Sequence, residues 1–380
     1  MNPYFTRALD LRDVLLHKSC FLFGPRQTGK STLIRETLRG HRVYDLLDGE
    51  VFLDLSRNPR RLEEEIQPDD DLIVIDEIQK LPSLLDEVHR IIENRGMRFL
   101  LTGSSARKLR RGGVNLLGGR ARSRYLHPLL KRELGGRFDL LTALNRGLIP
   151  SIYLSDAPLE DLKSYAGDYL TQEISAEGLT RNIPAFSRFL QVAAVCNGTL
   201  INYSNISNDA QVPSSTVQEY FQILRDTLIA FDVPAWKKTT RRKPLSTSKF
   251  YFFDVGVVRF LQNRSELKER SPEFGDALET YIAHELKSYV DYKGAGDLCY
   301  WRSKSGYEVD FVVGDNLAVE VKAKANLSSN DLKGLRALRE EGKLEHYVAV
   351  TLEKRPRTVD GIRVLPWSDF LDQLWESAYC

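Results

Sequence analysis

The stretch from Cys20 to Thr32 constrains the fold most strongly, because an apolar run enters a glycine-punctuated loop there. The run Phe21-Leu22-Phe23 is typical of a short buried strand. The residues directly after this run fit the pattern G-x-x-x-x-G-K-[ST] of a phosphate-binding loop. The candidate nucleotide-binding residues of this loop are Gly24, Pro25, Arg26, Gln27, Thr28, Gly29, Lys30, Ser31 and Thr32.

Each part of this loop suits a phosphate group. Gly24 and Gly29 permit a backbone whose amide N–H groups point at an anion, and the helix after the loop has partial positive charge at its N-terminus. We expect Lys30 to reach the β- and γ-phosphates of ATP and the Ser31 hydroxyl to hold Mg²⁺. The alternative is an ordinary strand–helix turn that contains glycines.

A second apolar run ends in two carboxylates. The run Leu72-Ile73-Val74-Ile75 resembles a buried parallel strand, and Asp76 and Glu77 follow it directly. Active sites of open α/β sheets lie at the carboxyl ends of the strands, so we expect both side chains beside the loop. We predict that Asp76 holds Mg²⁺ through water and that Glu77 positions the attacking water. A role only in capping the next helix is the alternative.

Two further segments contribute candidates. The strand-like run at 98–101 ends in Thr102-Gly103-Ser104-Ser105, where a hydroxyl can sense the γ-phosphate or align the water. We nominate Ser104, with Thr102 as the alternative. The segment 118–124 holds several arginines, and one of them could act in trans on a neighbouring subunit's nucleotide. A solvated basic loop is an equally good interpretation of that segment.

Composition limits the class of protein. A length of 380 residues indicates two or three domains, and 42% hydrophobic with 28% charged residues is typical of soluble globular proteins. The net charge is only +2, so any nucleic-acid footprint must be local. No signal pattern and no membrane-length apolar run is visible, so we expect a cytoplasmic protein without a membrane partner. The scattered cysteines argue against zinc and disulfides.

The pattern of strands and helices divides the chain into four predicted parts. Strands alternate with helices over 1–127, which predicts a P-loop ATPase core of α/β class with a parallel sheet. Helical spacing of apolar residues predicts a lid or connector over 128–194. We predict a winged helix over 195–262, whose second helix carries Val217, Tyr220, Phe221 and Leu224 on one face. A further α/β domain is expected over 263–380.

The evidence for DNA contact in the winged helix is mixed. The second helix could enter a groove, yet its exposed first turn offers Gln218 and Glu219 instead of arginine. The basic run 237–243 stands where a wing would touch phosphates. A docking role for the helix and a solvated loop for the basic run are the alternatives.

A second chemical constellation lies near the C-terminus. The segments 307–313 and 318–322 alternate in period two, and Gly314-Asp315-Asn316 suits a tight hairpin between them. If the loop has three residues, antiparallel pairing sets Asp310 opposite Glu320 and Glu308 opposite Lys322. Opposed carboxylates repel each other, and a divalent ion would offset the repulsion.

Asp310 and Glu320 are therefore candidate ligands of Mg²⁺ or Mn²⁺. A metal-activated water could then hydrolyse a phosphodiester while Lys322 steadies the developing charge. Glu279 and Glu285, on an expected helix over 276–289, could add a further carboxylate. The alternative is a salt-bridged solvent face without a metal.

Taken together, these residues resemble those of the bacterial and archaeal P-loop ATPases of the AAA+ superfamily. The relatives in question carry a C-terminal domain of unknown function with a restriction-endonuclease-like end. The resemblance rests on segments 24–32, 75–80, 101–105, 119–120, 252–256, 300–302, 308–310 and 320–322. It implies ATP hydrolysis and a catalytic triplet of Asp310, Glu320 and Lys322. Val309 stands where that pattern often has proline. Because AAA+ relatives usually form rings, the resemblance favours Arg120 as the trans-acting arginine and implies a homo-oligomer, for which a hexameric ring is one arrangement.

These observations support one leading hypothesis and one alternative. The leading hypothesis is Mg²⁺-dependent ATP hydrolysis coupled to DNA binding or remodelling, with a nuclease-like C-terminal domain. The alternative is a nucleotide-dependent switch or scaffold for a protein partner, with an inactive nuclease-like fold. The sequence leaves open the DNA structure preferred, the ring size, the biological pathway, the protein partners and whether the C-terminal site cuts.

Overall fold

A computed structural model of the protein describes residues 4–105, 117–169, 182–269 and 271–379. The chain forms two compact units. The N-terminal unit comprises 3–129 together with Asp226–Ile229, and the C-terminal unit comprises Leu130–Arg225 and Ala230–Cys380. Each unit has its own main sheet and its own core.

The N-terminal unit is built on a five-stranded parallel sheet with the strand order β2-β3-β4-β1-β5. The α/β class and the parallel sheet predicted from the alternating pattern are thus confirmed. The strands are β1 Ser19–Phe23, β2 Arg42–Asp45, β3 Leu72–Asp76, β4 Arg98–Gly103 and β5 Ala121–Tyr125. The helices are α1 Leu11–Leu15, α2 Lys30–Thr37, α3 Gly49–Arg57, α4 Arg61–Glu64 and α5 Leu84–Arg95, with short 3-10 turns η1 Ile78–Lys80 and η2 Leu117–Gly119.

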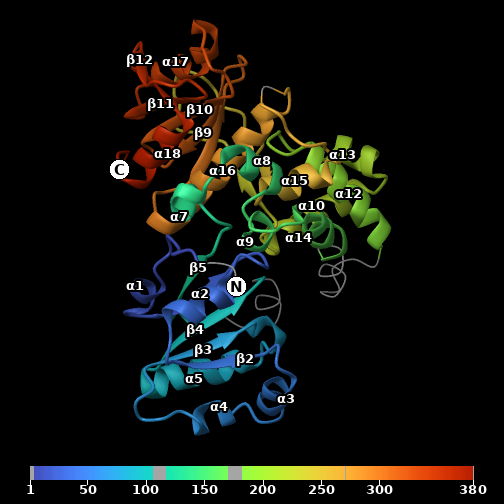
Figure 1. Cartoon of the computed structure of the whole chain (residues 1–380), viewed down its shortest axis with the longest axis vertical. Helices are drawn as coiled ribbons and strands as arrows, with labels where there is room; N and C mark the ends of the chain where they lie inside the picture. Colours follow the sequence, from blue (N-terminus) through green and yellow to red (C-terminus); the bar gives the residue numbers. More distant parts are fainter. Residues whose placement is uncertain (1–3, 106–116, 170–181, 270, 380) are drawn as a thin grey trace. The chain divides into compact units, whose positions relative to one another are not determined.

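One face of this sheet is covered by α5, as Figure 1 shows beside β3. Alternate strand residues such as Phe21 and Ile73 point to this face and pack against Leu84 and Val88 of the helix. Because β1 lies between β4 and β5, the loop that leaves its end is surrounded by the ends of neighbouring strands. The sheet therefore sets the phosphate-loop residues close to those that follow β3 and β4.

The first part of the C-terminal unit is helical. Its helices are α7 Lys131–Leu134, α8 Leu140–Arg146, α9 Pro150–Tyr153, α10 Pro158–Lys163, α12 Ile183–Val195, α13 Tyr203–Ala210, α14 Ser214–Asp226 and α15 Val255–Leu261, with short turns η3 Gly135–Arg137 and η4 Ser164–Tyr169. The four apolar residues predicted on one helix face lie on α14 and are all buried. The antiparallel strands β6 Ala230–Val233 and β7 Lys249–Phe252 follow α14. The winged-helix assignment stays a prediction.

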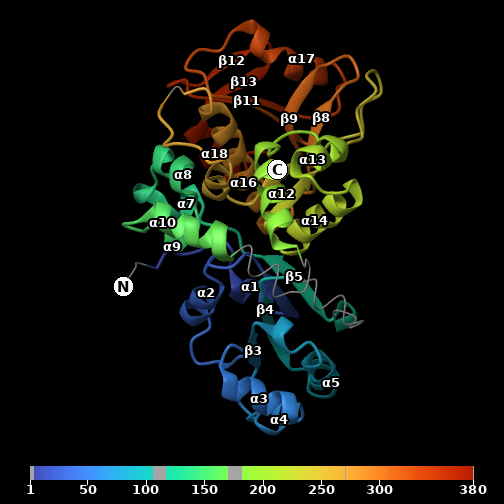
Figure 2. The same cartoon turned by 90° about the vertical axis from the view of Figure 1, so that its right-hand side faces the viewer.

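The second part of this unit contains a six-stranded mixed sheet in the order β12-β13-β11-β10-β9-β8, and Figure 2 shows β11, β12 and β13 side by side. The strands are β8 Leu298–Arg302, β9 Glu308–Val313, β10 Leu317–Lys322, β11 His346–Thr351, β12 Arg357–Val359 and β13 Ile362–Pro366. The helices are α16 Phe274–Lys293, α17 Lys333–Arg339 and α18 Trp367–Trp375, with the turn η5 Ser329–Leu332. The core includes Trp301 of β8 and Leu335 of α17, both fully buried.

The hairpin between β9 and β10 has the three-residue loop that the sequence indicates. Val313 pairs with Leu317 and Phe311 pairs with Val319, a register that brings Asp310 next to Glu320. The ladder then opens, because the Val321 N–H donates to the Asp310 carboxylate over 2.8 Å. This open end of the hairpin exposes the carboxylates to residues from other elements.

The segment between β6 and β7 runs along the edge strand β8. The Trp236 N–H donates to the Tyr300 carbonyl over 2.7 Å, and the Leu245 N–H donates to the Arg302 carbonyl over 2.9 Å. The basic run 237–243 therefore belongs to the edge of the C-terminal sheet. Among the described residues, no helix is both long enough and apolar enough to cross a membrane.

Candidate functional site

The strand–helix loop after β1 depends on two glycines. Gly29 caps α2 with a φ of 94°, a left-handed conformation that strains any residue with a Cβ atom. A Cβ atom on Gly24 would lie 2.5 Å from the Leu126 carbonyl oxygen. Both glycines are therefore required for this close, sharply curved backbone, and loop geometry explains why the sequence places them there.

The Lys30 side chain points back into this loop. Its ammonium donates to the carbonyl oxygens of Gly24 over 2.8 Å and Pro25 over 3.1 Å, and the residue is 6% exposed. Thr28 also donates to the Pro25 carbonyl, over 2.8 Å. Of the remaining loop residues, Gln27 is exposed while Arg26 and Thr32 are half-buried.

Arg7 braces the loop from outside the motif. Its guanidinium donates to the Thr28 carbonyl over 2.7 Å and to the His127 carbonyl over 2.6 Å. These bonds join the loop to the segment after β5, far away in sequence. No local pattern in the sequence marks Arg7, and it was not among the predicted site residues.

Three side chains meet where β3 and β4 end. The Ser31 hydroxyl donates to one Asp76 carboxylate oxygen over 2.7 Å, and the Thr102 hydroxyl donates to the other. The Glu77 N–H in turn donates to Thr102 over 3.2 Å. Hydroxyl and carboxylate oxygens are the hard ligands that Mg²⁺ prefers, so Ser31 and Asp76 fit a magnesium ion that arrives with a nucleotide.

Glu77 and Ser104 are joined by Gln79, which was not among the predicted site residues. The Gln79 side-chain amide donates to the Glu77 carboxylate and, over 3.3 Å, to the Ser104 hydroxyl. Its own carbonyl oxygen is buried and has no hydrogen-bond partner. Glu77 has a φ of 61°, in the left-handed region that non-glycine residues seldom adopt. The only sequence signal for Gln79 was its place two residues after Glu77.

Arg120 follows the turn η2 and forms an ion pair with Glu93 of α5. The pair is exposed on the N-terminal unit, with 37% of the Arg120 side chain accessible. This partial exposure leaves the guanidinium available to a second subunit once the Glu93 contact is exchanged. The trans-acting role stays a prediction.

The C-terminal unit brings the predicted triplet together. The Lys322 ammonium lies 2.6 Å from the Glu320 carboxylate and 3.9 Å from that of Asp310. The second Glu320 oxygen is buried without a hydrogen-bond partner. Glu285 lies elsewhere on α16, where it accepts from the Lys131 N–H over 2.8 Å and from Trp375.

A second lysine, Lys249 of β7, completes this cluster. Its ammonium lies 2.7 Å from the Glu308 carboxylate, 3.8 Å from that of Glu279 and 3.9 Å from that of Asp310. The Lys249 side chain is 5% exposed. Glu308 thus pairs with Lys249 instead of the expected Lys322. The sequence feature that could have pointed to Lys249 is a cationic residue at the start of a strand that is otherwise aromatic.

The charged groups of this cluster shift one another's pKa values. Burial, together with the negative charge of Asp310, raises the pKa of Glu279 to about 7. Burial likewise raises the pKa of Glu320 well above its usual value. Burial opposes the charge of Lys249, but the surrounding carboxylates outweigh it and raise the pKa of its ammonium. Carboxylates raise the pKa of the Lys322 ammonium in the same way, so both lysines stay charged at neutral pH.

A cavity of about 300 Å³ adjoins the cluster and is lined by Lys249, Glu279, Glu308 and Asp310 among others. Within the part of the chain that the structure describes, no group of three His, Cys, Asp or Glu side chains is arranged to hold a metal ion. Ammonium groups lie between the carboxylates instead. The donor set of this cluster therefore does not fit the divalent ion predicted for Asp310 and Glu320.

Comparison with protein-family models gives three matches. Residues 16–135 match an AAA domain, AAA_14. Residues 137–268 and 274–370 match two domains of unknown function, DUF8612 and DUF4143 respectively. No curated protein matches the sequence.

Solved structures show only distant similarity. Pif1 helicase from Candida albicans is 17% identical with a TM-score of 0.24, and the match covers 41% of this chain and 46% of that one. The Aeropyrum pernix Orc1 protein in complex with DNA is 16% identical with a TM-score of 0.26, covering 67% and 90%. Domain III of the Thermotoga maritima replication initiation protein DnaA is 14% identical with a TM-score of 0.24, covering 44% and 80%.

The phosphate loop, the acidic strand end and the family matches agree with one another. The AAA domain model spans β1 to β5 and so contains Lys30, Asp76 and Glu77. The DUF4143 model spans the Asp310, Glu320 and Lys322 cluster. The chain is thus a P-loop protein with an N-terminal AAA domain and a C-terminal domain of unknown function.

Proposed function

We propose that the protein hydrolyses ATP with Mg²⁺ and couples hydrolysis to DNA binding or remodelling. The observation that carries the first half is the contact of Ser31 with Asp76 at 2.7 Å beside the loop that holds Lys30. A phosphate-binding loop, a hydroxyl and a carboxylate converge there from α2 and β3. This combination suits a nucleoside triphosphate with its metal better than any other ligand.

Each residue of the site has a distinct role in the proposed reaction. Lys30 exchanges its bonds with the loop carbonyls for the β- and γ-phosphates. Glu77 orients and polarises the attacking water, and Gln79 holds Glu77 and Ser104 in a fixed relation. Mg²⁺, held by Ser31 and by Asp76 through water, would offset the charge of the phosphates.

We further propose that the protein acts as a homo-oligomer in which Arg120 reaches a neighbour's nucleotide. Arg120→Ala is then expected to lower ATP turnover about tenfold or more, because the arginine stabilises charge in the transition state. The matched control is Glu93→Gln, which releases the ion pair but keeps the arginine. ATP turnover of both variants is measured over a range of protein concentrations. Equal losses in the two variants would show that the ion pair matters only for the fold.

The coupling to DNA is tested by ATP turnover with single-stranded, duplex and branched DNA. We expect stimulation that weakens as salt rises, because contacts with phosphates release counterions. Exposed residues of the basic run, such as Lys237 and Arg241, are the candidate contacts. Turnover that no DNA changes would contradict the coupling while leaving the ATPase proposal intact.

A specific observation favours the second candidate, a nucleotide-dependent switch for a protein partner. Part of the basic run is occupied within its own unit: Lys238 pairs with Asp315, and Arg242 pairs with Glu340. Glu341 accepts from the backbone N–H groups of 240–242, at 2.9 to 3.0 Å. The segment is therefore held in place by carboxylates, which reduces its capacity for phosphate. Turnover indifferent to DNA would favour this candidate.

A further inference from the structure

The Lys249 ammonium has the surroundings of a bound cation. Three carboxylates, those of Glu308, Glu279 and Asp310, lie 2.7 to 3.9 Å from its nitrogen. They come from β9 and α16, whereas Lys249 comes from β7. The side chain is nearly inaccessible, so water contributes little to balancing these charges.

The carboxylates would repel one another without this ammonium. Asp310 is nearly buried and its two neighbours are half-buried, so a positive charge at this position stabilises the carboxylates. The second lysine does not supply it, because Lys322 pairs with Glu320 at 2.6 Å on the other side of Asp310. Arg302 lies 3.5 Å from the other Glu308 oxygen, but Lys249 is the ammonium that faces Glu308, Glu279 and Asp310 together.

We propose that Lys249 is an internal replacement for a divalent cation, so that the wild-type cluster binds no metal and its carboxylates form a metal site only when this ammonium is removed. Among the described residues these carboxylates are not arranged around a metal as they stand, so we expect the side chains of Glu308, Glu279 and Asp310 to close on an ion only once the ammonium is gone. The adjoining cavity of about 300 Å³ gives an ion and its water a place to enter. Hard oxygen ligands in this number suit Mg²⁺ or Mn²⁺. The inference concerns the C-terminal unit alone and does not depend on the ATPase proposal.

The test uses the full chain without nucleotide, with Mn²⁺ as the probe. Free Mn²⁺ is measured by electron paramagnetic resonance for wild type, Lys249→Met and the double variant Lys249→Met/Asp310→Asn. We expect Lys249→Met to gain a Mn²⁺ site at least tenfold tighter than any wild-type site and to lose it in the double variant. Lys238→Met is the matched control, because Lys238 is exposed and pairs with Asp315.

Two results would overturn the proposal. One is a wild-type Mn²⁺ site that Asp310→Asn removes, since the ammonium would then leave room for a metal. The other is a Lys249→Met variant that folds normally and binds no Mn²⁺. If Lys249→Met is less stable, its melting temperature with and without Mn²⁺ decides: recovery by Mn²⁺ supports the proposal, and the absence of recovery contradicts it.

Discussion

Lys30→Ala is expected to reduce ATP turnover roughly 1000-fold and to weaken nucleotide binding, because the variant removes the charged donor that lies inside the loop. In the structure the ammonium already lies against the carbonyls of Gly24 and Pro25, within reach of anything the loop amides bind. Alanine leaves the backbone amides of the loop in place but removes the ammonium that would contact the phosphates together with them. Both binding and the transition state therefore lose stabilisation.

The measurement is steady-state phosphate release together with equilibrium binding of a fluorescent ATP analogue. Lys18→Ala is the matched control, because Lys18 is exposed on the same unit and its ammonium bonds to the Gly119 carbonyl. Turnover by Lys30→Ala at the wild-type rate would remove the ATP site from this loop. Loss in both variants would point to the stability of the unit.

The N-terminal site could be predicted because its determinants are local. The loop residues 24–32 adjoin one strand, and Asp76 with Glu77 directly follows another, so apolar runs fix their place at the sheet edge. Because all strands of this sheet are parallel, their carboxyl ends share one edge, where the Ser31 hydroxyl donates to Asp76. Arg7 was missed because its contacts depend on how distant segments pack. Gln79 was missed because its bond to Ser104 joins two segments 25 residues apart, although it stands close to Glu77 in the sequence.

In the C-terminal cluster, too, the contacts set by local sequence could be predicted and the long-range contact could not. The hairpin register follows from period-two alternation and a three-residue loop, so the proximity of Asp310, Glu320 and Lys322 was predictable. Lys249 was not, because β7 lies about 60 residues earlier and meets this hairpin only in the folded unit. The carboxylates do lie close enough to repel one another, as expected. In the structure the positive charges between them are ammonium groups, where a metal was predicted.

Glu77→Gln is expected to keep ATP binding close to the wild-type value and to reduce turnover roughly 1000-fold. General bases contribute factors of about 10² to 10⁴, and an amide cannot polarise water as a carboxylate does. Binding is preserved because Lys30, Ser31 and Asp76 are untouched. The Gln79 amide also keeps an acceptor, since the new side chain still offers a carbonyl oxygen in place of the carboxylate.

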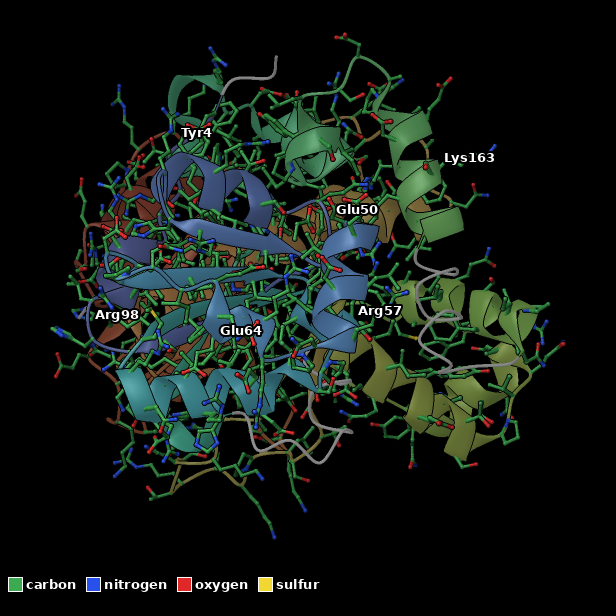
Figure 3. All side chains as sticks on the ribbon, turned by 90° about the horizontal axis from the view of Figure 1, so that it is seen from below. Tyr4, Glu50, Arg57, Glu64, Arg98 and Lys163 are labelled. Carbon is green, nitrogen blue, oxygen red and sulfur yellow. The ribbon has the colours of Figure 1, made fainter. Side chains whose placement is uncertain are left out.

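Single-turnover hydrolysis and nucleotide binding, measured on the same preparation, separate these two effects. Glu64→Gln is the matched control, because Glu64 lies exposed at the end of α4, where Figure 3 labels it. A Glu77→Gln variant that hydrolyses at the wild-type rate would move the water-positioning role elsewhere, with Ser104 next in line through Gln79. Loss of binding as well as turnover would mean that the left-handed backbone at Glu77, with its φ of 61°, needs the carboxylate to hold the end of β3 in place.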